Sequence, residues 1–248
     1  MFTFLLKRFY QAVIVMFVIS LVAFSIQDNL GDPLRELVGQ SVSESVRQEL
    51  RDKMGLNDPF LVKYSRFLQN AVQGDLGTSY FFKRPALEVI LDKLVATLEL
   101  VFAAALIIVV VSIPLGVYSA IRPRSFLTKL IMAVSSIGIS IPVFLTAIML
   151  MYLFSIQLGW LPAYGRGETY NLLGWESGFF TWDGIKHLIL PAVSLSSIML
   201  PLFIRLVRSE MLEQLSSEYV KFARAKGLDN NKVYYQHALK NTMLPVIT

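Results

Sequence analysis

Long apolar runs, separated by shorter polar segments, dominate this chain. A helix needs roughly 17–25 apolar residues to cross about 30 Å of hydrocarbon. Four runs meet that length, at residues 9–26, 96–120, 130–156 and 188–207, and a fifth begins near Thr242. The pattern therefore predicts an all-α fold, that of a polytopic α-helical membrane protein.

The first run admits two interpretations, a cleaved signal peptide or a permanent anchor. Lys7 and Arg8 precede it, as they would in a signal peptide. However, the chain continues Gln-Asp-Asn-Leu-Gly-Asp-Pro from position 27, without a small-residue cleavage site. We therefore predict an uncleaved transmembrane anchor at residues 1–27.

The segment between the first two runs, residues 28–95, is predicted to be helical. One amphipathic helix is expected after position 43, with Ser43 or Ser45 as its N-cap and Gly55 as its C-cap. A second is expected from about 59 to 72, where aromatic and aliphatic residues recur near helical spacing. These helices either cover the outer mouth of a pathway or form a solvated cap that only shapes the subunit.

Basic residues predict the orientation. Short basic segments lie before the first run, between the second and third, and after the fourth, all on one side if the chain crosses four times. Cytoplasmic segments are enriched in Lys and Arg, so that side and the N-terminus are expected in the cytoplasm. Residues 28–95 and 157–186 then face outward, where Trp160, Trp175 and Trp182 suit the headgroup zone.

Composition narrows the functional classes. Hydrophobic residues make up 54% of the chain and charged residues 17%, as in an integral membrane protein. There is no cysteine, and His187 and His237 are far apart, so we expect no disulfide and no metal site. The net charge of +5 comes from basic residues beside apolar runs, which argues against nucleic-acid binding.

Motifs of catalysis are also absent from the sequence. No serine lies in a Gly-x-Ser-x-Gly motif, and no histidine pair has zinc-helix spacing. Gly227 and Lys232 come closest to a phosphate-binding loop, but its second glycine and its terminal serine or threonine are missing. We therefore expect no catalytic residue, no cofactor and no binding of ATP by this chain itself.

The apolar runs contain few polar side chains. The pathway candidates are Ser135, Ser136, Ser140 and Pro142 in the third run, and Ser194 and Ser197 in the fourth. Small and hydroxylated residues also permit close helix packing, which is the commoner explanation for them. Glu99, in the first turn of the second run, is expected at the membrane interface rather than in a proton relay.

The segment after the fourth run combines a short basic helix, a glycine and a second helix. It reads Glu-Tyr-Val-Lys-Phe-Ala-Arg-Ala-Lys-Gly-Leu over 218–228, then His-Ala-Leu-Lys-Asn from 237 and Leu-Pro at 244–245. This pattern resembles the cytoplasmic coupling loop of inner-membrane permeases of binding-protein-dependent ABC importers. More narrowly, it resembles their dipeptide, oligopeptide, glutathione and nickel branch. Shorter matches occur in order along the chain, including Gly-Asp-Pro at 31–33, Gly-Leu-Asn-Asp-Pro at 55–59 and Leu-Gly-Trp-Leu-Pro at 158–162.

Some features depart from the general importer pattern. The general loop opens with Glu-Ala-Ala six residues before its glycine, whereas this chain has Lys221, Phe222 and Ala223 there. The interval from glycine to proline is also longer than in sugar importers, and both departures resemble the peptide branch. Family members continue through further membrane helices, so we expect the chain ending at Thr248 to be truncated or its reading frame to be split, and we expect a permease that ends there not to transport.

The resemblance implies a transport subunit, not an enzyme, with a core permease domain at 96–248 and a coupling loop at about 210–241. The implied ATPase-coupling residues are Phe222, Ala223, Arg224, Ala225, Lys226, Gly227 and Leu228. The implied partners are a second permease subunit, two cytoplasmic ATPase subunits that hold ATP and Mg, a periplasmic solute-binding protein and membrane lipid. The implied location is a bacterial inner membrane.

The implied mechanism is a lever. Closure of the ATPases would swing the docked helix and tilt the third to fifth runs from inward to outward opening. Gly227 would allow the turn, because glycine tolerates positive φ. Arg224 and Lys226 either pair with acidic groove residues or are ordinary positive-inside charges. Ala223 and Ala225 either permit close approach or reflect helix propensity.

The substrate is less determined by the resemblance. Short peptides, including glutathione-like ones, are favoured over chelated nickel or an oligosaccharide. A nucleotide-independent secondary carrier or channel, and a non-transporting membrane scaffold, are the alternatives from other classes.

Overall fold

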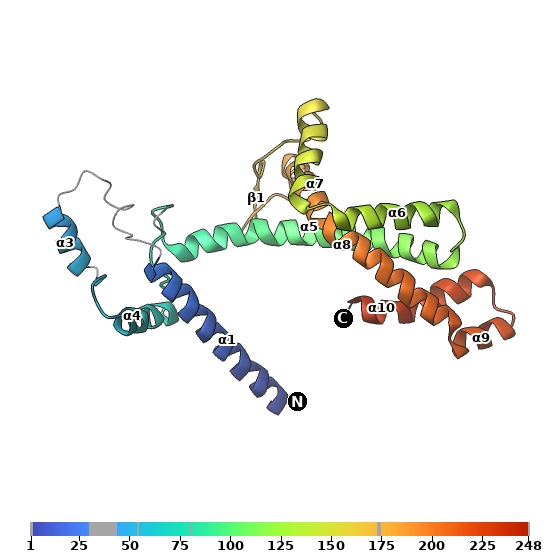
Figure 1. Ribbon diagram of the computed structural model, residues 1–248, viewed down its shortest axis with the longest axis horizontal. Helices are drawn as coiled ribbons and strands as arrows, with labels where there is room; N and C mark the ends of the chain where they lie inside the picture. The colour runs from blue at the N-terminus through green and yellow to red at the C-terminus, as the bar shows by residue number, and fades with distance from the viewer. Residues whose placement is uncertain (1, 30–43, 54, 80, 173–174, 248) are drawn as a thin grey trace. The chain divides into compact units, whose positions relative to one another are not determined.

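The computed structural model describes residues 2–29, 44–53, 55–79, 81–172 and 175–247, and almost all of its regular structure is helical (Figure 1). The chain divides into two compact units, Met1–Lys93 and Leu94–Thr248. Helices α1, α3 and α4 belong to the first unit, and α5 begins in the first and continues into the second. The helical content, with several helices long enough to cross a membrane, confirms the predicted all-α membrane fold.

Helix α1 (Phe2–Asn29) begins seven residues before the predicted run, and its segment Phe2–Ile26 is apolar enough to cross a membrane. It packs on α4 (Phe60–Val72) through aromatic rings: Phe24 lies 5.4–5.7 Å from Phe60, Tyr64 and Phe67, between ring centroids. The Tyr64 hydroxyl is also 2.8 Å from Ser20 Oγ. The predicted helix at 59–72 is thus confirmed, with an aromatic face against α1.

Helix α3 (Glu44–Lys53) confirms the first predicted helix of the polar segment. Ser45 lies inside it, so Ser45 is not the N-cap, and Ser43 lies outside the described residues. Gly55 does end the helix, with φ at +64°. The amide of Gly55 donates to the Asp52 carbonyl at 3.1 Å and that of Leu56 to the Arg51 carbonyl at 3.0 Å, which is a Schellman ending.

The predicted third span is not one continuous helix. Helix α6 (Phe126–Ser140) and the segment formed by α7 (Val143–Leu150) and the π-helix η1 (Met151–Gln157) meet at 108°. Pro142 has no amide hydrogen to continue the α6 ladder, and it pushes Ile141 into an extended conformation, with φ −90° and ψ 123°. The apolar run predicted at 130–156 is therefore bent near Pro142, and this bend was not predicted from the sequence.

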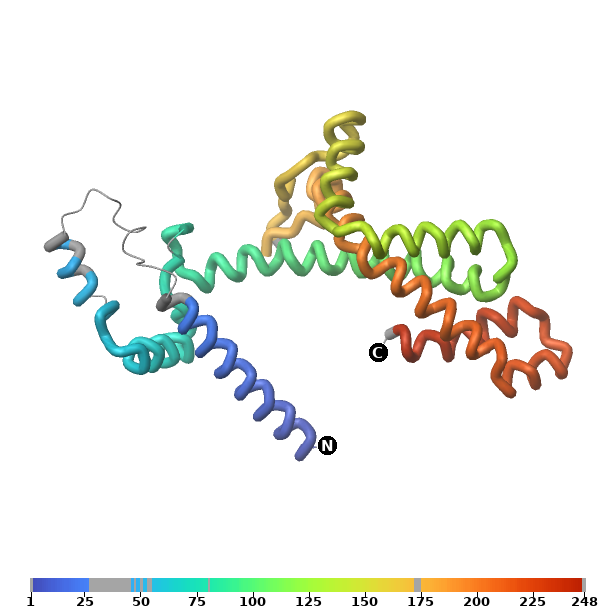
Figure 2. Tube along the Cα trace, viewed as in Figure 1, coloured from blue at the N-terminus to red at the C-terminus, as the bar shows by residue number. Residues whose placement is uncertain are grey.

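Two long helices complete the membrane-length elements of the second unit. Helix α5 (Ala86–Ile121) and helix α8 (Trp182–Ser216) are each long and apolar enough to cross a membrane, and each contains proline: Pro114 in α5, Pro191 and Pro201 in α8. With α1 they make three spanning helices among the described residues, or four if the bent pair counts as one span. Helix α8 packs against α6, α7 and α10 (Leu239–Ile247), so it is central to this unit (Figure 2).

The segment between η1 and α8 contains a small hairpin. Strands β1 (Tyr170–Leu172) and β2 (Trp175–Ser177) pair antiparallel, with Tyr170 opposite Ser177. The sequence predicts that residues 157–186 face outward, and it does not predict this hairpin. Thr181 then caps α8, accepting a hydrogen bond from the Gly184 amide at 3.0 Å.

Candidate functional site

The basic helix predicted from the sequence is α9 (Glu218–Ala225), and its ending is defined by hydrogen bonds. Gly227 has φ at +74°, its amide donates to the Arg224 carbonyl at 2.9 Å, and the Leu228 amide donates to the Ala223 carbonyl at 3.3 Å. This is again a Schellman ending. A Cβ on Gly227 would meet nothing within 4 Å, so the backbone conformation, not space, requires glycine here.

The inner face of α9 is buried in the chain itself. Val220 is 0% exposed and Ala223 is 5% exposed. They share a core with residues of α5, of α8 and of the π-helix η2 (Lys232–Ala238). The core is completed by Val117, Ala120, Val207, Met211, Val233 and Ala238. The small side chain of Ala223 therefore lies in a buried contact within the subunit.

The outer face of α9 is exposed in the part of the chain that the structure describes. Phe222 is 61% exposed, and the Lys226 ammonium lies over its ring, 4.5 Å from the centroid. Arg224 and Ala225 are exposed, and Leu228 is at the border of exposed and half-buried. Lys221 is paired with Glu218 at 2.8 Å. The structure thus separates the predicted coupling residues into buried Ala223 and an exposed surface, which we call the α9 outer face: Phe222, Arg224, Ala225, Lys226 and Leu228.

The core against which α9 packs depends on a close approach of α5 to α8 and on contacts of α10. A Cβ on Gly116 of α5 would lie 2.7 Å from Val207 Cβ of α8, so glycine permits this approach. Thr242 of α10 donates to the Ala238 carbonyl at 2.9 Å and also contacts Met211 Sδ at 3.6 Å. The sequence analysis did not identify these residues. The spacing of Val207 and Met211, four apart on one helix face, was the available signal.

The predicted pathway serines use their hydroxyls mostly within their own helices. Ser136 donates to the Met132 carbonyl at 2.9 Å and Ser140 to the Ser136 carbonyl at 3.2 Å. Ser194 donates to the Leu190 carbonyl at 2.8 Å and Ser197 to the Ser194 carbonyl at 2.7 Å. Such bonds satisfy a hydroxyl inside an apolar layer without water.

The pathway candidates differ in exposure. Ser135 and Ser194 are buried, Ser197 is half-buried, and Ser136, Ser140 and Pro142 are exposed. Ser136 alone among the four serines bonded to their own helices also accepts a hydrogen bond from another helix, from Arg205 Nη2 of α8 at 2.8 Å. Packing therefore accounts for the buried members, while the exposed group on α6 is available to a partner or ligand.

Glu99 has a role that the sequence did not predict. It is 6% exposed; Oε1 accepts from the Gly178 amide at 2.9 Å, and Oε2 accepts from Arg166 Nη2 at 3.3 Å. Arg166 also donates to the Glu176 carbonyl. Arg166 is the sole Lys or Arg at 157–181, which was the available signal for this ion pair. Glu99 thus fixes the hairpin segment to α5.

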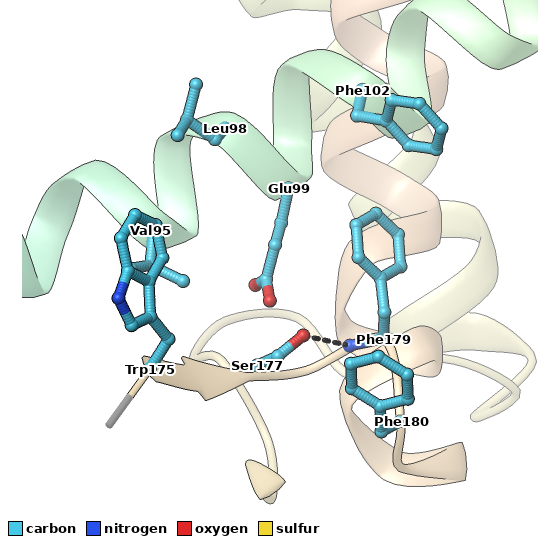
Figure 3. Close-up of a pocket in the computed structure, with 8 residues that line it drawn as sticks. All are labelled: Val95, Leu98, Glu99, Phe102, Trp175, Ser177, Phe179 and Phe180. Carbon is cyan, nitrogen blue, oxygen red and sulfur yellow. Dashed lines mark hydrogen bonds between the residues drawn. The ribbon is translucent and has the colours of Figure 1, made fainter. Parts of the chain in front are cut away.

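A cavity of about 480 Å³ lies beside this ion pair (Figure 3). Its lining is Val95, Leu98, Glu99 and Phe102 from α5, and Trp175, Ser177, Phe179 and Phe180 from the hairpin segment. Phe102 and Phe179 meet edge to face at 5.9 Å. Figure 3 shows the Glu99 carboxylate directed from α5 toward the segment that carries Ser177. Both oxygens of the Glu99 carboxylate accept hydrogen bonds from the chain, so this carboxylate stabilises the contact between α5 and the hairpin segment.

Long apolar helices with internally bonded hydroxyls are the architecture of a multi-pass membrane protein. The family described as "Binding-protein-dependent transport system inner membrane component" matches residues 112–248. The family described as "Binding-prot-dependent transport system membrane comp, N-term" matches residues 1–101. The chain belongs to this family of inner-membrane transport components.

Alignments with curated relatives cover the whole chain. The dipeptide transport system permease protein DppB of Alkalihalophilus pseudofirmus is 34% identical, over 100% of this chain and 78% of that protein. The oligopeptide transport system permease protein AppB of Bacillus subtilis is 38% identical, over 100% and 77%. The glutathione transport system permease protein GsiC of Escherichia coli is 30% identical, over 100% and 76%.

Proposed function

We propose that this chain is the permease subunit of an ATP-driven importer of short peptides, and that α9 with its Gly227 turn couples it to a separate ATPase. The observation that carries the proposal is the two-sided character of α9. One side is buried against α5, α8 and η2, while the other presents an aromatic ring and two cations without burying them. A helix that is fixed on one side and open on the other is suited to bind a partner and move with it.

The chemistry of the α9 outer face defines its partner. Phe222 supplies an apolar anchor, and Arg224 and Lys226 supply positive charge at its edge. A helix of this kind fits a groove with an apolar floor and acidic rim on a cytoplasmic ATPase subunit. ATP and Mg would be held by that subunit. Ala223 is buried, so in this proposal it supports α9 from within the subunit instead of contacting the groove.

Force on α9 would reach the membrane helices through the shared core. Val220 and Ala223 contact the cluster that contains Val207 and Met211 of α8, and packed interiors transmit displacement because they hold few voids. Movement of α9 would therefore displace the end of α8 and, through η2, the start of α10. Two such subunits, each contributing half of a pathway, would alternate between inward and outward opening.

The remaining parts of the assembly are inferred from charge and from the relatives. The basic segments favour a cytoplasmic N-terminus, and the polar segment with α3 and α4 then faces the periplasm, where a solute-binding protein delivers its ligand. Exposed apolar side chains along α1 would contact membrane lipid or another subunit. Relatives named for dipeptides, oligopeptides and glutathione support short peptides as the substrate class.

Co-purification of the importer tests this proposal. The chain, expressed with the products of neighbouring genes, is expected to retain an ATPase subunit whose hydrolysis rises when the peptide-loaded binding protein is added. The ligand of that binding protein identifies the substrate, so a chelated nickel ion there would correct the substrate class. Failure of any ATPase to associate would overturn the proposal in favour of a nucleotide-independent carrier.

A further inference from the structure

Two arginines of α8 reach across to α6. Arg205 Nη2 donates to Ser136 Oγ at 2.8 Å, and Arg208 Nη1 lies 3.8 Å from Met132 Sδ. The arginines are three residues apart, and so are neighbours on one face of the helix. The two contacts bring a pair of guanidinium groups to the face of α6 that carries Ser136, one of the exposed pathway candidates.

Neither guanidinium is neutralised by the described part of the chain. The ion pairs there involve other cations, namely Arg66, Arg84, Arg166, His187 and Lys221. Arg208 Nε is buried and has no hydrogen-bond partner. Arg205, in contrast, is exposed and donates one of its five possible hydrogen bonds to Ser136. Arg205 lies two residues before the end of the apolar run at 188–207, and Arg208 lies just beyond it. Charges beside an apolar layer favour a partner of opposite sign, so an anionic partner from outside this chain is expected.

The position along the helices favours a solute over a lipid headgroup. Ser136 is ten residues beyond Phe126, where α6 begins next to the basic turn at 122–125. Ten residues correspond to about 15 Å along an α-helix. A lipid phosphate stays at the edge of a hydrocarbon layer of about 30 Å, whereas Arg205 is bonded to a serine farther along α6.

We propose that Arg205 and Arg208, with Arg205 positioned by Ser136, bind the terminal carboxylate of a peptide in transit. The inference rests on the proposed function as a peptide importer, and names the group by which the pathway recognises its substrate class. A guanidinium matches a carboxylate with two parallel hydrogen bonds. Every free peptide carries this carboxylate whatever its side chains, so such a site accepts many sequences while rejecting neutral solutes.

Ser136 positions the group rather than binding substrate itself. The Ser136 hydroxyl donates its hydrogen to the Met132 carbonyl, so its oxygen is left to accept a hydrogen bond from Arg205. This bond holds one edge of the Arg205 guanidinium group in place. The remaining donors of Arg205 stay open. Arg208, whose Nε has no hydrogen-bond partner among the described residues, supplies a second positive charge one helical turn away.

Transport by the complete importer in proteoliposomes, assembled with a full-length version of this permease, its second permease subunit, its ATPase and its binding protein, is the first test. The probe is dialanine, and the variants are Arg205→Gln, Arg205→Lys and, as a control with the same loss of charge, Arg124→Gln in the exposed turn before α6. Arg205→Gln is expected to lower kcat of uptake by about tenfold or more, because a charge-assisted hydrogen bond is lost. Arg205→Lys should recover part of it, and Arg124→Gln should match the unaltered importer.

The reactivity of an introduced cysteine with charged reagents distinguishes carboxylate binding by Arg205 from a role of Arg205 in packing alone. The chain has no native cysteine, so Ser140→Cys, one turn from Ser136, gives it a single thiol. Anionic sulfonatoethyl methanethiosulfonate is expected to react faster than its cationic trimethylammonioethyl counterpart, and Arg205→Gln should remove that preference. Excess dialanine should slow the reaction, and dialanine amide should not.

The outcomes that overturn the inference are distinct from those that overturn the function. An unreactive thiol would mean that this face is covered by lipid or by the second permease subunit. Unchanged dialanine uptake by Arg205→Gln, or an unchanged preference between the two reagents, would also reject carboxylate binding while leaving peptide import intact. Absence of dialanine uptake by the unaltered importer would overturn the proposed function, and this inference with it.

Discussion

Helices α3 and α9 are both short and amphipathic, and both end at a glycine with positive φ, Gly55 at +64° and Gly227 at +74°. Their surroundings differ. In α9, Val220 and Ala223 are buried in a core that includes two membrane-length helices. In α3, Val46 is 45% exposed, and Arg51 is the one half-buried residue among those whose exposure is described. The backbone ending is therefore the same in both helices, and burial of one face is what distinguishes α9, the proposed lever, from α3.

Gly55 and Gly227 also differ in what a side chain at each position would contact. A Cβ on Gly55 would collide with the Arg66 guanidinium and approach Asp58 Oδ2 to 2.7 Å, within an ion pair of 2.7 Å. A Cβ on Gly227 would enter open space. Gly55 thus serves contacts of its own unit, whereas Gly227 serves only the direction of the chain between α9 and η2.

The largest effect is expected from a charge in the α9 core. Val220→Asp should abolish ATPase stimulation, because an unpaired carboxylate would be buried at 0% exposure. Val46→Asp on exposed α3 is the matched control and should leave stimulation nearly unchanged. Val220→Ala, which loses about 2 kcal/mol of packing without adding charge, should give a partial loss in a folded protein. Equal effects of the two aspartates would remove the distinction between the helices.

Substitution at the α9 turn should have the next largest effect. Gly227→Val should cost about 1–2 kcal/mol, because a β-branched residue resists positive φ, and should reduce uptake more than ATP hydrolysis. Gly227→Asn, which tolerates that conformation, should retain most uptake. The ratio of peptide transported to ATP hydrolysed is the measurement, and normal coupling in Gly227→Val would contradict the lever.

Reversal of charge on the α9 outer face should have a moderate effect. Arg224→Glu combined with Lys226→Glu should reduce ATPase co-purification several-fold, since each exposed pair contributes about 0.2–1 kcal/mol. The same double reversal at Arg124 and Lys129, in and after the turn between α5 and α6, is the control. If both pairs of substitutions behave alike, these cations act only through general charge.

The smallest effect is expected from two cysteine substitutions, which test on which side of the membrane α4 and the end of α8 lie. Ser65→Cys on α4 and Ser216→Cys at the end of α8 both place a thiol at an exposed position. An impermeant maleimide applied to intact spheroplasts should label the cysteine at 65 and not the one at 216, with uptake unaffected. The opposite pattern would invert the proposed orientation and move α9 away from the cytoplasm.

Local sequence signals predicted much of the fold. The helix at 59–72, the glycine endings at Gly55 and Gly227 and the long apolar runs follow from periodicity and backbone preference within a few residues. The 108° bend was missed although Pro142 was singled out, because proline within a span either kinks or ends a helix and neighbours decide which.

Long-range contacts set the limit of prediction from the sequence. The ion pair of Glu99 with Arg166 and the contact of Arg205 with Ser136 each join residues more than sixty positions apart. Periodicity within one segment carries no information on such pairing. For the same reason the coupling segment was located from its residues, but the division of α9 into a buried and an exposed face required the fold.

Helix α5 is attached at two points, to α8 and to the segment before α8. Gly116 meets Val207 of α8, and Glu99 binds Gly178, three residues before Thr181 caps α8. Glu99 and Gly116 are 17 residues apart, about 25 Å along α5. A displacement of α5 from α8 would have to break the contact at Gly116, and a displacement from the hairpin segment would have to break the hydrogen bond to Glu99. We therefore expect both attachments to persist during transport, so that α5 is displaced together with α8.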